Sequence, residues 1–485
     1  MNHTVALRCY VDHGKTASTF TPDLTLPNSS VVLVFDTETT VDEHQNLLFG
    51  SCGVWVNGVS SEFYIFYNED TVNEKDIEII KSYAEKHKHK VLTRKQFVEN
   101  VFYPFIYTAR TTCVGFNLPF DLSRLAIHFA RSRKYANGFS FKLSKNPAVP
   151  DIIVKSIHSK AAFIEFTRPP AGAKAKKGST TKKQHYRGRF TDLRTAAFAL
   201  TNNVYSLDKA LNDFGCDHYK LTPDGHGKIT EEYVDYNVND TLATYELYQK
   251  IIDRYSLYGL KREISKLFSP ASIGKAYLEK RGVRSFHMRN PNFSAGLLGK
   301  VMSTYYGGRT ELRIRNTAVR VAYLDATSMY PTVYTLLGMD SFLKAAKIVA
   351  HGTTAETQAL LDNITIEDIV DKQTWRKLKT ICKIRPDNDI LPVRSKYGSK
   401  DTYNIGINYV KSADGTCLWY TLPDLIASKL LSGKTPVIEE AITFSHIGIQ
   451  QELKDIEILM RIAVAPEDDL VKRIIEERIA VKHGA

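Results

Sequence analysis

The first part of the chain alternates between apolar runs and charged stretches, and this pattern predicts strands followed by a helix. Residues 31–35 are apolar throughout and predict a buried strand that ends in polar residues near position 40. The apolar runs at 47–58 and 62–68 predict the next strands of the same sheet, as a hairpin or meander. Residues 75–89 are rich in charge and predict an exposed helix.

A strand, a turn and a helix are predicted around residue 117. Residues 114–116 predict a short strand and 117–120 a turn, in which Pro119 has no amide proton for a ladder hydrogen bond. Asp121 then opens an amphipathic helix. The apolar face of this helix is expected to contain Leu122, Leu125, Ala126 and Phe129.

The second half of the chain predicts a mixture of strands and helices. Residues 319–324 predict a strand that ends at Asp325. Residues 338–400 look like an insertion, and 408–421 predict a hairpin with a turn at Asp414-Gly415. A helix and then a strand are predicted within 421–440, and a last helix covers the C-terminal residues from 468.

Composition narrows the class of protein. The 485 residues suggest about three domains. A net charge of +12 is compatible with a polyanionic partner such as nucleic acid, although charge alone is weak evidence. The six cysteines form no C-x-x-C pair, so we infer neither a zinc site nor a disulfide framework, and we expect a reducing compartment. No signal-peptide layout or membrane-length apolar run is found, so we expect a soluble intracellular protein without a membrane partner.

A strongly basic, glycine- and serine-containing loop is predicted between the strand near residue 163 and residue 190. It is either an ordinary solvated loop or a contact for phosphates, and the sequence favours neither. Its basic residues are Lys174, Lys176, Lys177, Lys182, Lys183, Arg187 and Arg189.

Asp36 and Glu38 stand out because they close the first apolar strand. The two-residue period of a strand places both side chains on one side of the sheet. Two neighbouring carboxylates repel each other unless a cation lies between them or one is protonated. The pair therefore suggests a divalent metal site, and the alternative is a strand that simply ends in a polar turn.

Two further segments supply acids that a metal site would need. Asp121 stands at the start of its predicted helix, where it could equally be an N-cap or a partner of the helix dipole. Residues 230–255 predict a long helix that begins at Thr230, and Tyr236 and Asp240 lie one turn apart on one of its faces. The alternative for this pair is an ordinary helix that carries a tyrosine and an aspartate.

Taken in order, three short patterns resemble the exonuclease motifs of a known family. They are Asp36-x-Glu38 at a strand end, Asn117-x-x-Phe120-Asp121 at a strand-to-helix turn, and Tyr236-x-x-x-Asp240 on a helix. This set resembles the proofreading 3′–5′ exonuclease domain of the family B DNA polymerases. The resemblance implies an RNase H-like α/β domain with a mixed sheet.

The resemblance also assigns roles to these residues. Asp36, Glu38, Asp121 and Asp240 would be the carboxylates that hold two Mg²⁺ ions, with Mn²⁺ as an alternative, and Asp36 would bridge both. Two such ions activate a water molecule and stabilise the leaving oxygen during phosphodiester hydrolysis. By the same resemblance, Tyr236 would orient the water, and Asn117 and Phe120 would hold the 3′ end of single-stranded DNA. Lys220 is a candidate phosphate contact.

The segment Tyr305-Tyr306-Gly307-Gly308 resembles the Tyr-x-Gly-Gly motif between the exonuclease and polymerase domains of the family, which is especially familiar in its protein-primed branch. Paired glycines allow a nucleic-acid strand to approach the backbone, and Arg309 adds positive charge. The motif would therefore contact DNA. A tight structural turn is the alternative.

Residues 325–331, DATSMYP, resemble polymerase motif A, with Met329 in place of leucine. The resemblance implies that Asp325 binds a catalytic Mg²⁺ and that Ser328 and Tyr330 contact the incoming dNTP. Lys482 occupies the place of the dNTP-binding lysine of the fingers helix, although an ordinary basic helix end would look the same.

The resemblance is incomplete in the polymerase half. No Asp-Thr-Asp hairpin is present, the fingers motif is not complete, and Asp387-Asn388-Asp389 lies in the wrong place to replace the hairpin. We therefore expect a fragment that ends inside the fingers motif and cannot polymerise by itself.

The expected organisation is an RNase H-like exonuclease domain followed by an incomplete α+β palm. The expected parts are a lead-in at 1–30, the exonuclease at 31–255, a connection at 256–318, and a partial palm at 319–485 that includes the insertion and the start of the fingers helix. The expected function is that of a family B, DNA-directed DNA polymerase with a proofreading exonuclease, which acts in replication. Expected partners are primer-template DNA, a single-stranded 3′ end, dNTPs and, in the protein-primed branch, a terminal protein. The alternatives are a stand-alone 3′–5′ exonuclease and a non-catalytic nucleic-acid-binding protein.

Overall fold

The computed structural model describes residues 4–10, 30–167, 186–221, 225–308, 314, 316–326, 328–396 and 403–482. The chain divides into two compact units. We call Thr19–Tyr277 the N-terminal unit, and Leu278–Ala485 together with Met1–Ser18 the C-terminal unit. The range expected for the exonuclease, 31–255, lies inside the N-terminal unit, and the expected connection at 256–318 is shared between the two.

The N-terminal unit is organised around a six-stranded mixed sheet with the order β10-β5-β1-β2-β3-β4. The predicted meander is confirmed, because the first three strands pair as antiparallel neighbours. Strand β5 pairs in parallel with β1 on one side and with β10 on the other, while β4 pairs in parallel with β3. The strands are β1 (Val31–Thr39), β2 (Leu47–Val56), β3 (Val59–Tyr67), β4 (Lys90–Thr93), β5 (Thr112–Gly115) and β10 (Arg189–Asp192).

Side chains along β1 point alternately to the two faces of the sheet. Leu33 and Phe35 belong to the hydrophobic core formed with Phe97 and Phe102 on one face of the sheet. Side chains at even positions, including those of Asp36 and Glu38, therefore point to the other face. On that face lies a second core, which includes Phe49 of β2.

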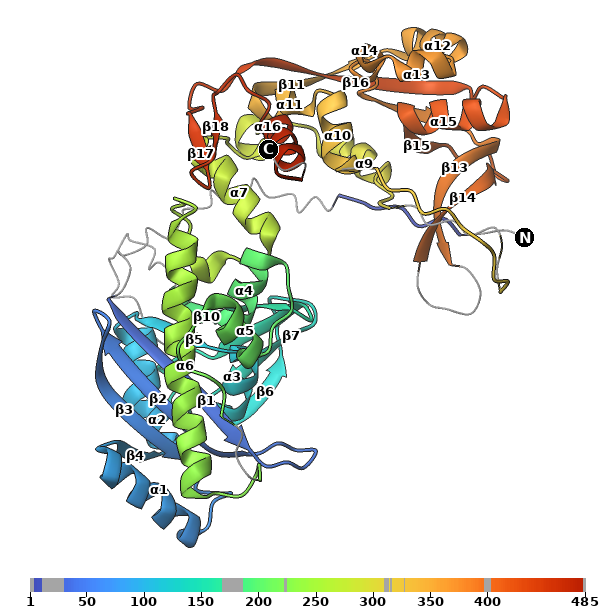
Figure 1. Ribbon diagram of the computed structural model, residues 1–485. Coiled ribbons are helices and arrows are strands. Elements are labelled where there is room, and N and C mark those ends of the chain that lie inside the picture. The colour runs from blue at the N-terminus through green and yellow to red at the C-terminus, as the bar shows by residue number, and fades with distance from the viewer. Residues whose placement is uncertain are drawn as a thin grey trace, which may run out of the picture. The chain divides into compact units, whose positions relative to one another are not determined.

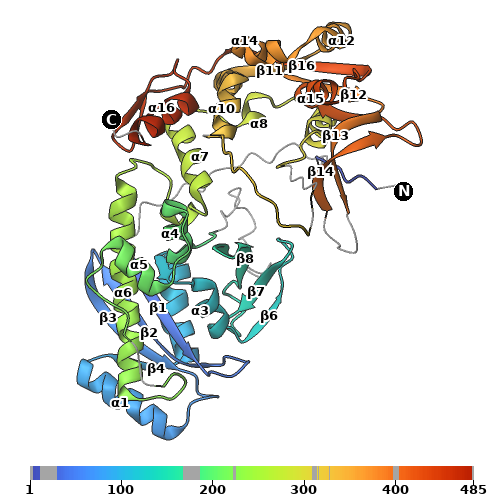
Figure 2. The same cartoon turned by 45° about the vertical axis from the view of Figure 1, so that its right-hand side comes forward.

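The long helix α6 (Glu231–Ser256) covers this second face and lies along β1 and β2 (Figures 1 and 2). Thr230 caps it by accepting a hydrogen bond from the backbone N–H of Tyr233, as the start signal predicted. The Trp55 ring of β2 stacks on Tyr245 at 3.9 Å between centroids. This contact fixes the helix at the start of β1, since Trp55 pairs in register with Val32.

The N-terminal unit contains further helices and a second sheet, and its last helix, α7, continues past Tyr277 into the C-terminal unit. The exposed helix predicted at 75–89 is α1, although one of its faces is buried against the core. A separate antiparallel sheet has the order β6-β7-β8-β9. The bounds are α1 (Glu74–His87), α2 (Arg94–Phe97), the π-helix η1 (Val98–Thr108), α3 (Leu118–Leu125), β6 (His128–Arg131), β7 (Gly138–Lys142), β8 (Ile152–His158), β9 (Ala161–Phe166), α4 (Leu193–Thr201), α5 (Leu207–Phe214), the 3₁₀ helix η2 (Ile264–Lys266) and α7 (Pro270–Lys280).

Helix α3 is shorter than the predicted amphipathic helix. It ends at Leu125, and Ala126 already has extended backbone angles. The amide of Ile127 donates to the carbonyl of Lys142, which starts the pairing of β6 with β7. The expectation that Phe129 lies on the apolar helix face was wrong, since Phe129 is in β6 and is 66% exposed. Ladder pairing with β7 replaced the last helical turn.

The C-terminal unit is built on a four-stranded antiparallel sheet with the order β11-β16-β12-β15. Its core includes Cys382, Tyr420 and Leu425. The helix and strand predicted within 421–440 are α15 and β16, and the predicted last helix is α16. The bounds are α8 (Phe286–Arg289), α9 (Ala295–Ser303), α10 (Met329–Leu336), α11 (Met339–Lys344), β11 (Ala345–Gly352), α12 (Thr354–Asn363), α13 (Ile366–Val370), α14 (Lys372–Trp375), β12 (Thr380–Ile384), β13 (Asp387–Lys396), β14 (Tyr403–Lys411), β15 (Leu418–Thr421), α15 (Leu422–Ser432), β16 (Ile438–Ile449), β17 (Ile456–Ile458), β18 (Ile462–Val464) and α16 (Leu470–Lys482).

Two strand predictions for this unit were wrong. Residues 319–324 belong to none of the described strands, and Tyr323 and Leu324 are each 90% exposed. An apolar run becomes a strand only where a neighbouring strand accepts its ladder hydrogen bonds, and none of the described sheets offers this segment a partner. The hairpin at 408–421 does not form either, because β14 pairs with β13 and β15 pairs with β12.

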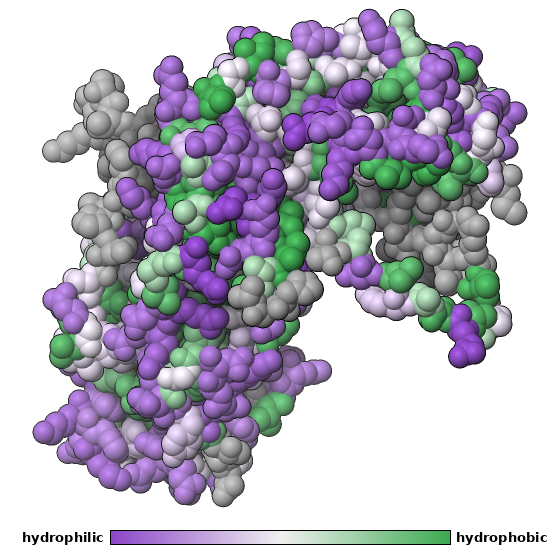
Figure 3. Space-filling model, turned by 45° about the horizontal axis from the view of Figure 1, so that its top comes forward, coloured by the Kyte–Doolittle hydropathy of each residue, from purple (hydrophilic) through white to green (hydrophobic). Residues whose placement is uncertain are grey.

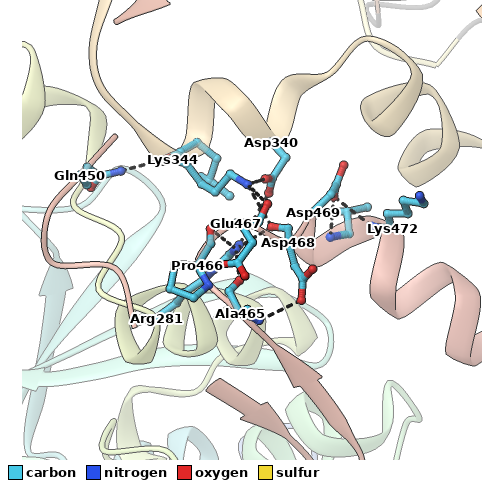
Figure 4. A network of polar contacts seen from close by, with 12 residues as sticks. Arg281, Asp340, Lys344, Gln450, Ala465, Pro466, Glu467, Asp468, Asp469 and Lys472 are labelled. Atoms are coloured by element: carbon cyan, nitrogen blue, oxygen red, sulfur yellow. Dashed lines mark hydrogen bonds and ion pairs between the residues drawn. The ribbon is translucent and has the colours of Figure 1, made fainter. Parts of the chain in front are cut away.

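A buried arginine ties the end of α7 to the segment that precedes α16 (Figure 4). One terminal nitrogen of Arg281 donates to the carbonyls of Ala465, Pro466 and Asp468 at 2.7–3.2 Å. Its other terminal nitrogen lies 3.6 Å from a carboxylate oxygen of Asp340, which also pairs with Lys344 at 2.8 Å. The side chain of Arg281 is fully buried. These charges hold three chain segments together in the C-terminal unit.

Most of the face drawn in Figure 3 is hydrophilic, with hydrophobic residues in smaller groups between the polar ones. None of the helices among the described residues has both the length and the apolar character that crossing a membrane requires.

Candidate active site

The site is built on the end of β1, where Asp36 pairs in register with Ser51 and Glu38 with Phe49. Both carboxylates meet side chains of α6. The amide nitrogen of Asn237 donates to Asp36 Oδ2 at 2.7 Å and approaches Glu38 Oε1 at 3.4 Å. The hydroxyl of Tyr233 donates to Glu38 Oε2 at 2.5 Å. Helix α6 therefore holds both acids of the predicted pair.

The same helix supplies the predicted Tyr236 and Asp240, which are both buried. Lys220, in the segment before α6, has its ammonium 3.7 Å from Asp240 Oδ2 and 5.6 Å from the centre of the Tyr236 ring. Lys220, predicted as a phosphate contact, therefore lies at the acidic cluster as an ion-pair partner of Asp240. Asp240 Oδ1 is buried and has no hydrogen-bond partner among the described residues.

Asp121 reaches the site from α3 and is 2% exposed. Its Oδ1 accepts a hydrogen bond from the hydroxyl of Thr37, the residue between the two acids of β1, at 2.7 Å. The turn before α3 is fixed by Asp192, whose Oδ1 accepts the backbone N–H groups of Asn117 and Leu118 at 2.8 and 3.1 Å. Asp121 is therefore not the N-cap of its helix, and it is directed toward β1 instead.

The pKa values show that the acids form one electrostatic cluster. Burial raises the pKa of Asp36 well above its ordinary value, and repulsion from Asp121, Glu38 and Asp240 raises it further. The other three predicted carboxylates are therefore all close enough to act on Asp36. Residues as far apart in the sequence as Asp36 and Asp240 meet in this cluster.

Burial is also the main cause for the other three acids. It raises the pKa of Glu38 to about 7, against the opposing hydrogen bond from Tyr233. It raises the pKa of Asp121 to about 8, opposed by the hydrogen bond from Thr37. It raises the pKa of Asp240, opposed first by the charge of Lys220. Removing these carboxylates from water without enough positive charge explains all four shifts.

The donor set fits a hard divalent cation, since Mg²⁺ prefers carboxylate oxygens and a cation would relieve the mutual repulsion. The unbonded, buried Asp240 Oδ1 points to the same fit. Within the described part of the chain, however, no group of three or more His, Cys, Asp or Glu side chains is arranged to hold a metal ion. The carboxylate oxygens are bonded instead to Asn237, Tyr233 and Thr37.

Asn117 and Phe120, expected to hold the 3′ end of DNA, lie partly exposed in the turn beside Asp121. Asn117 has φ +67°, a left-handed conformation that asparagine tolerates better than most residues. Its side-chain oxygen accepts from Arg194 at 3.3 Å, and the guanidinium of Arg124 lies 4.8 Å from the Phe120 ring centre. Both residues are therefore placed at the margin of the acidic cluster.

The basic loop that the sequence singled out lies mostly outside the described residues, including all five of its lysines. Its last two arginines are described. Arg189 forms an ion pair with Glu263 at 3.4 Å, and Arg187 lies 3.9 Å from Glu165. These two guanidinium groups therefore have protein partners.

In the C-terminal unit, the Tyr-x-Gly-Gly segment lies beside motif A. Gly307 has φ +94°, which requires glycine, and an added Cβ at Gly308 would lie 3.7 Å from the Tyr330 hydroxyl. Tyr305 and Tyr330 are 53% and 72% exposed. Two exposed tyrosines thus flank a glycine pair in this unit.

The other residues predicted for the polymerase half are Asp325, Ser328, Lys482 and Arg309. Asp325 is exposed in a segment outside the described helices and strands. The Ser328 hydroxyl accepts a hydrogen bond from Arg478 of α16 at 2.9 Å. Lys482 is the last residue of α16, and its side chain, like Arg309, lies outside the described residues.

Sequence reasoning missed four residues that touch the acids or fix their turn: Asn237, Tyr233, Thr37 and Asp192. Asn237 and Tyr233 could have been found from the sequence. Asn237 directly follows Tyr236 on the predicted helix, and Tyr233 lies one helical turn before Asn237. Thr37 and Asp192 had none, because their contacts depend on how β1, α3 and β10 meet in space.

We compared the chain with protein-family models and with curated proteins, and neither comparison gives a match.

Proposed function

We propose that the N-terminal unit is a metal-dependent 3′–5′ exonuclease of the family B DNA polymerase type, with an RNase H-like fold, that acts on single-stranded DNA. The observation that carries this proposal is the convergence of Asp36, Glu38, Asp121 and Asp240 from β1, α3 and α6 into one buried cluster. A protein that only binds nucleic acid gains nothing from buried acids, because they repel phosphates. The mixed sheet and the acids at its strand end support the expected fold.

The four carboxylates would hold two Mg²⁺ or Mn²⁺ ions, which supply an activated water and stabilise the leaving oxygen when bound. Tyr236, whose pKa is raised by burial and by Asp240, keeps its hydroxyl proton and orients the attacking water. Lys220 offsets the charge of Asp240 and attracts the scissile phosphate. Asn117 and Phe120 contact the terminal nucleotide from the margin of the cluster.

We propose further that the C-terminal unit is an α+β portion of the polymerase palm, which would bind primer-template DNA and dNTPs during replication, with a terminal protein as a further partner. The exposed Tyr305 and Tyr330 beside Gly307 and Gly308 support a DNA-contacting surface. Asp325 lies outside every described sheet, which favours the exonuclease as the activity to test first.

The test is degradation of a 3′-labelled single-stranded oligonucleotide in Mg²⁺ and in EDTA. We expect release of labelled mononucleotides in Mg²⁺, and loss of this activity in EDTA and in the Asp36→Ala/Glu38→Ala variant. The Asp240→Asn variant should lose the exonuclease activity as well. Its matched control is Asp253→Asn, which changes an exposed acid on the same helix and should keep full activity. Equal degradation by wild type and Asp240→Asn would refute the assigned site.

A further inference from the structure

Asn237 is completely buried between the sheet and α6, yet its amide faces two acids. Its Nδ2 lies 2.7 Å from Asp36 Oδ2 and 3.4 Å from Glu38 Oε1. Its own side-chain oxygen is buried without a hydrogen-bond partner among the described residues. The amide is thus oriented with its nitrogen toward the carboxylates, which leaves its own oxygen without a hydrogen bond. The reverse orientation would place the amide oxygen of Asn237 against the carboxylate oxygens.

The backbone of Asn237 is fixed by a hydrogen bond from strand β2. The hydroxyl of Ser51, which pairs in register with Asp36, donates to the carbonyl of Asn237 at 3.1 Å. The same hydroxyl and that of Thr241 are hydrogen-bonded at 2.7 Å. All three residues are fully buried. These contacts set the distance between helix α6 and the strand pair, and with it the position of the Asn237 amide.

Tyr233 provides the second fixed donor. Its hydroxyl donates to Glu38 Oε2, and its ring packs edge-on against Phe49 of β2, with 5.3 Å between centroids. The tyrosine is 1% exposed. Glu38 is therefore bonded at one oxygen by Tyr233 and approached at the other by Asn237.

We propose that Asn237 and Tyr233 are positioning residues, which hold Asp36 and Glu38 in one arrangement before a divalent cation binds. This inference rests on the proposed exonuclease site and extends it to residues outside the motif pattern Tyr236-x-x-x-Asp240. Both carboxylates must be ionised and adjacent when a cation binds, although they then repel each other. Donors that already hold the two side chains in place therefore reduce the free-energy cost of binding the cation. Mutation of a residue that hydrogen-bonds to a metal ligand typically lowers metal affinity or activity by about 10–100-fold.

The experiment compares wild type with Asn237→Leu and Tyr233→Phe. Tyr233→Phe removes only the hydroxyl donor. Asn237→Leu keeps the branched shape of the side chain and removes the donor nitrogen together with the amide oxygen, which has no hydrogen-bond partner among the described residues. Thr244→Val is the matched control, because its hydroxyl is buried on the same helix and has no hydrogen-bond partner among the described residues. Two quantities are measured: Mn²⁺ affinity by titration calorimetry without DNA, and kcat and KM for the single-stranded oligonucleotide.

We expect Mn²⁺ affinity and kcat to fall by about 10–100-fold in both donor variants, with KM for the oligonucleotide within about twofold of wild type. Thr244→Val should match wild type in all three quantities. A folded Tyr233→Phe with unchanged Mn²⁺ affinity and kcat would overturn the proposal, as would a rise in KM alone. Tyr233→Phe keeps the ring packing, so it decides the matter even if Asn237→Leu does not fold.

The two proposals fail in different ways. If wild type binds Mn²⁺ and the donor variants bind it more weakly, but no DNA is degraded, the positioning role stands and the exonuclease proposal fails. If wild type degrades DNA and the variants equal it, only the positioning role fails. Wild type that binds no Mn²⁺ overturns the positioning proposal together with the metal site.

Discussion

Raising the pH should destabilise the metal-free N-terminal unit, because its buried acids must lose protons. Burial raises the pKa of Glu38 from 4.5 to about 7 and that of Asp121 from 3.8 to about 8 in the folded protein. The folded state therefore binds more protons than the unfolded state between these values. The contribution of these two acids to the stability of the folded state is fully present below about pH 4, and it is lost as the pH rises from there through 7 to 8.

The size of the effect follows from the pKa of Glu38 alone. A change from 4.5 to about 7 corresponds to about 3 kcal/mol of unfolding free energy. For a unit of this size, that amounts to a decrease in Tm of roughly 6–12 °C. The raised pKa of Asp121 acts in the same direction.

The assay is thermal unfolding in EDTA at intervals from pH 5 to pH 8.5, for wild type, Glu38→Gln and Asp253→Asn. Glu38→Gln cannot lose a proton at this position, so its Tm should fall less with pH than that of wild type. Asp253→Asn removes an exposed acid and should show the full decrease. Parallel Tm curves for wild type and Glu38→Gln would refute the reasoning.

Adding Mg²⁺ extends the same prediction. A cation at the proposed site would bind the ionised carboxylates and stabilise the folded state by mass action. The increase in Tm should therefore be larger at pH 8 than at pH 5, where the acids hold protons. An increase that does not depend on pH would indicate binding elsewhere.

The remaining predictions concern the C-terminal unit. Arg281→Met should lower the unfolding free energy of this unit by about 1–3 kcal/mol, because the carbonyls of Ala465 and Pro466 lose their hydrogen-bond donor, while Asp340 keeps its ion pair with Lys344. Arg284→Met, at a half-exposed arginine, should change it by less than about 0.5 kcal/mol, and chemical denaturation would separate the two. Gly307→Ala should cost about 1–2 kcal/mol because of its φ of +94°, whereas Gly299→Ala within α9 should be neutral or stabilising, and equal effects would argue against the assigned turn.

Local pattern was a good guide where neighbouring residues decide the structure. The first strand, the meander, the helix α6 with its Thr230 cap and the helix α16 were all predicted from their own residues. Local pattern failed where pairing partners decide. Residues 319–324 read as a strand but have no neighbour in the described sheets, and Phe129 left the predicted helix because β7 pairs with its segment.

The acids show the same division. The two-residue period of β1 and the one-turn spacing on α6 determined that Asp36 and Glu38 share a face and that Tyr236 and Asp240 share another, because backbone geometry sets these relations. Only the tertiary structure decided that the two faces meet. Contacts such as Asn237 with Asp36 and Thr37 with Asp121 join residues 201 and 84 positions apart. No local rule contains such distances, since they arise from how the sheet and helices pack.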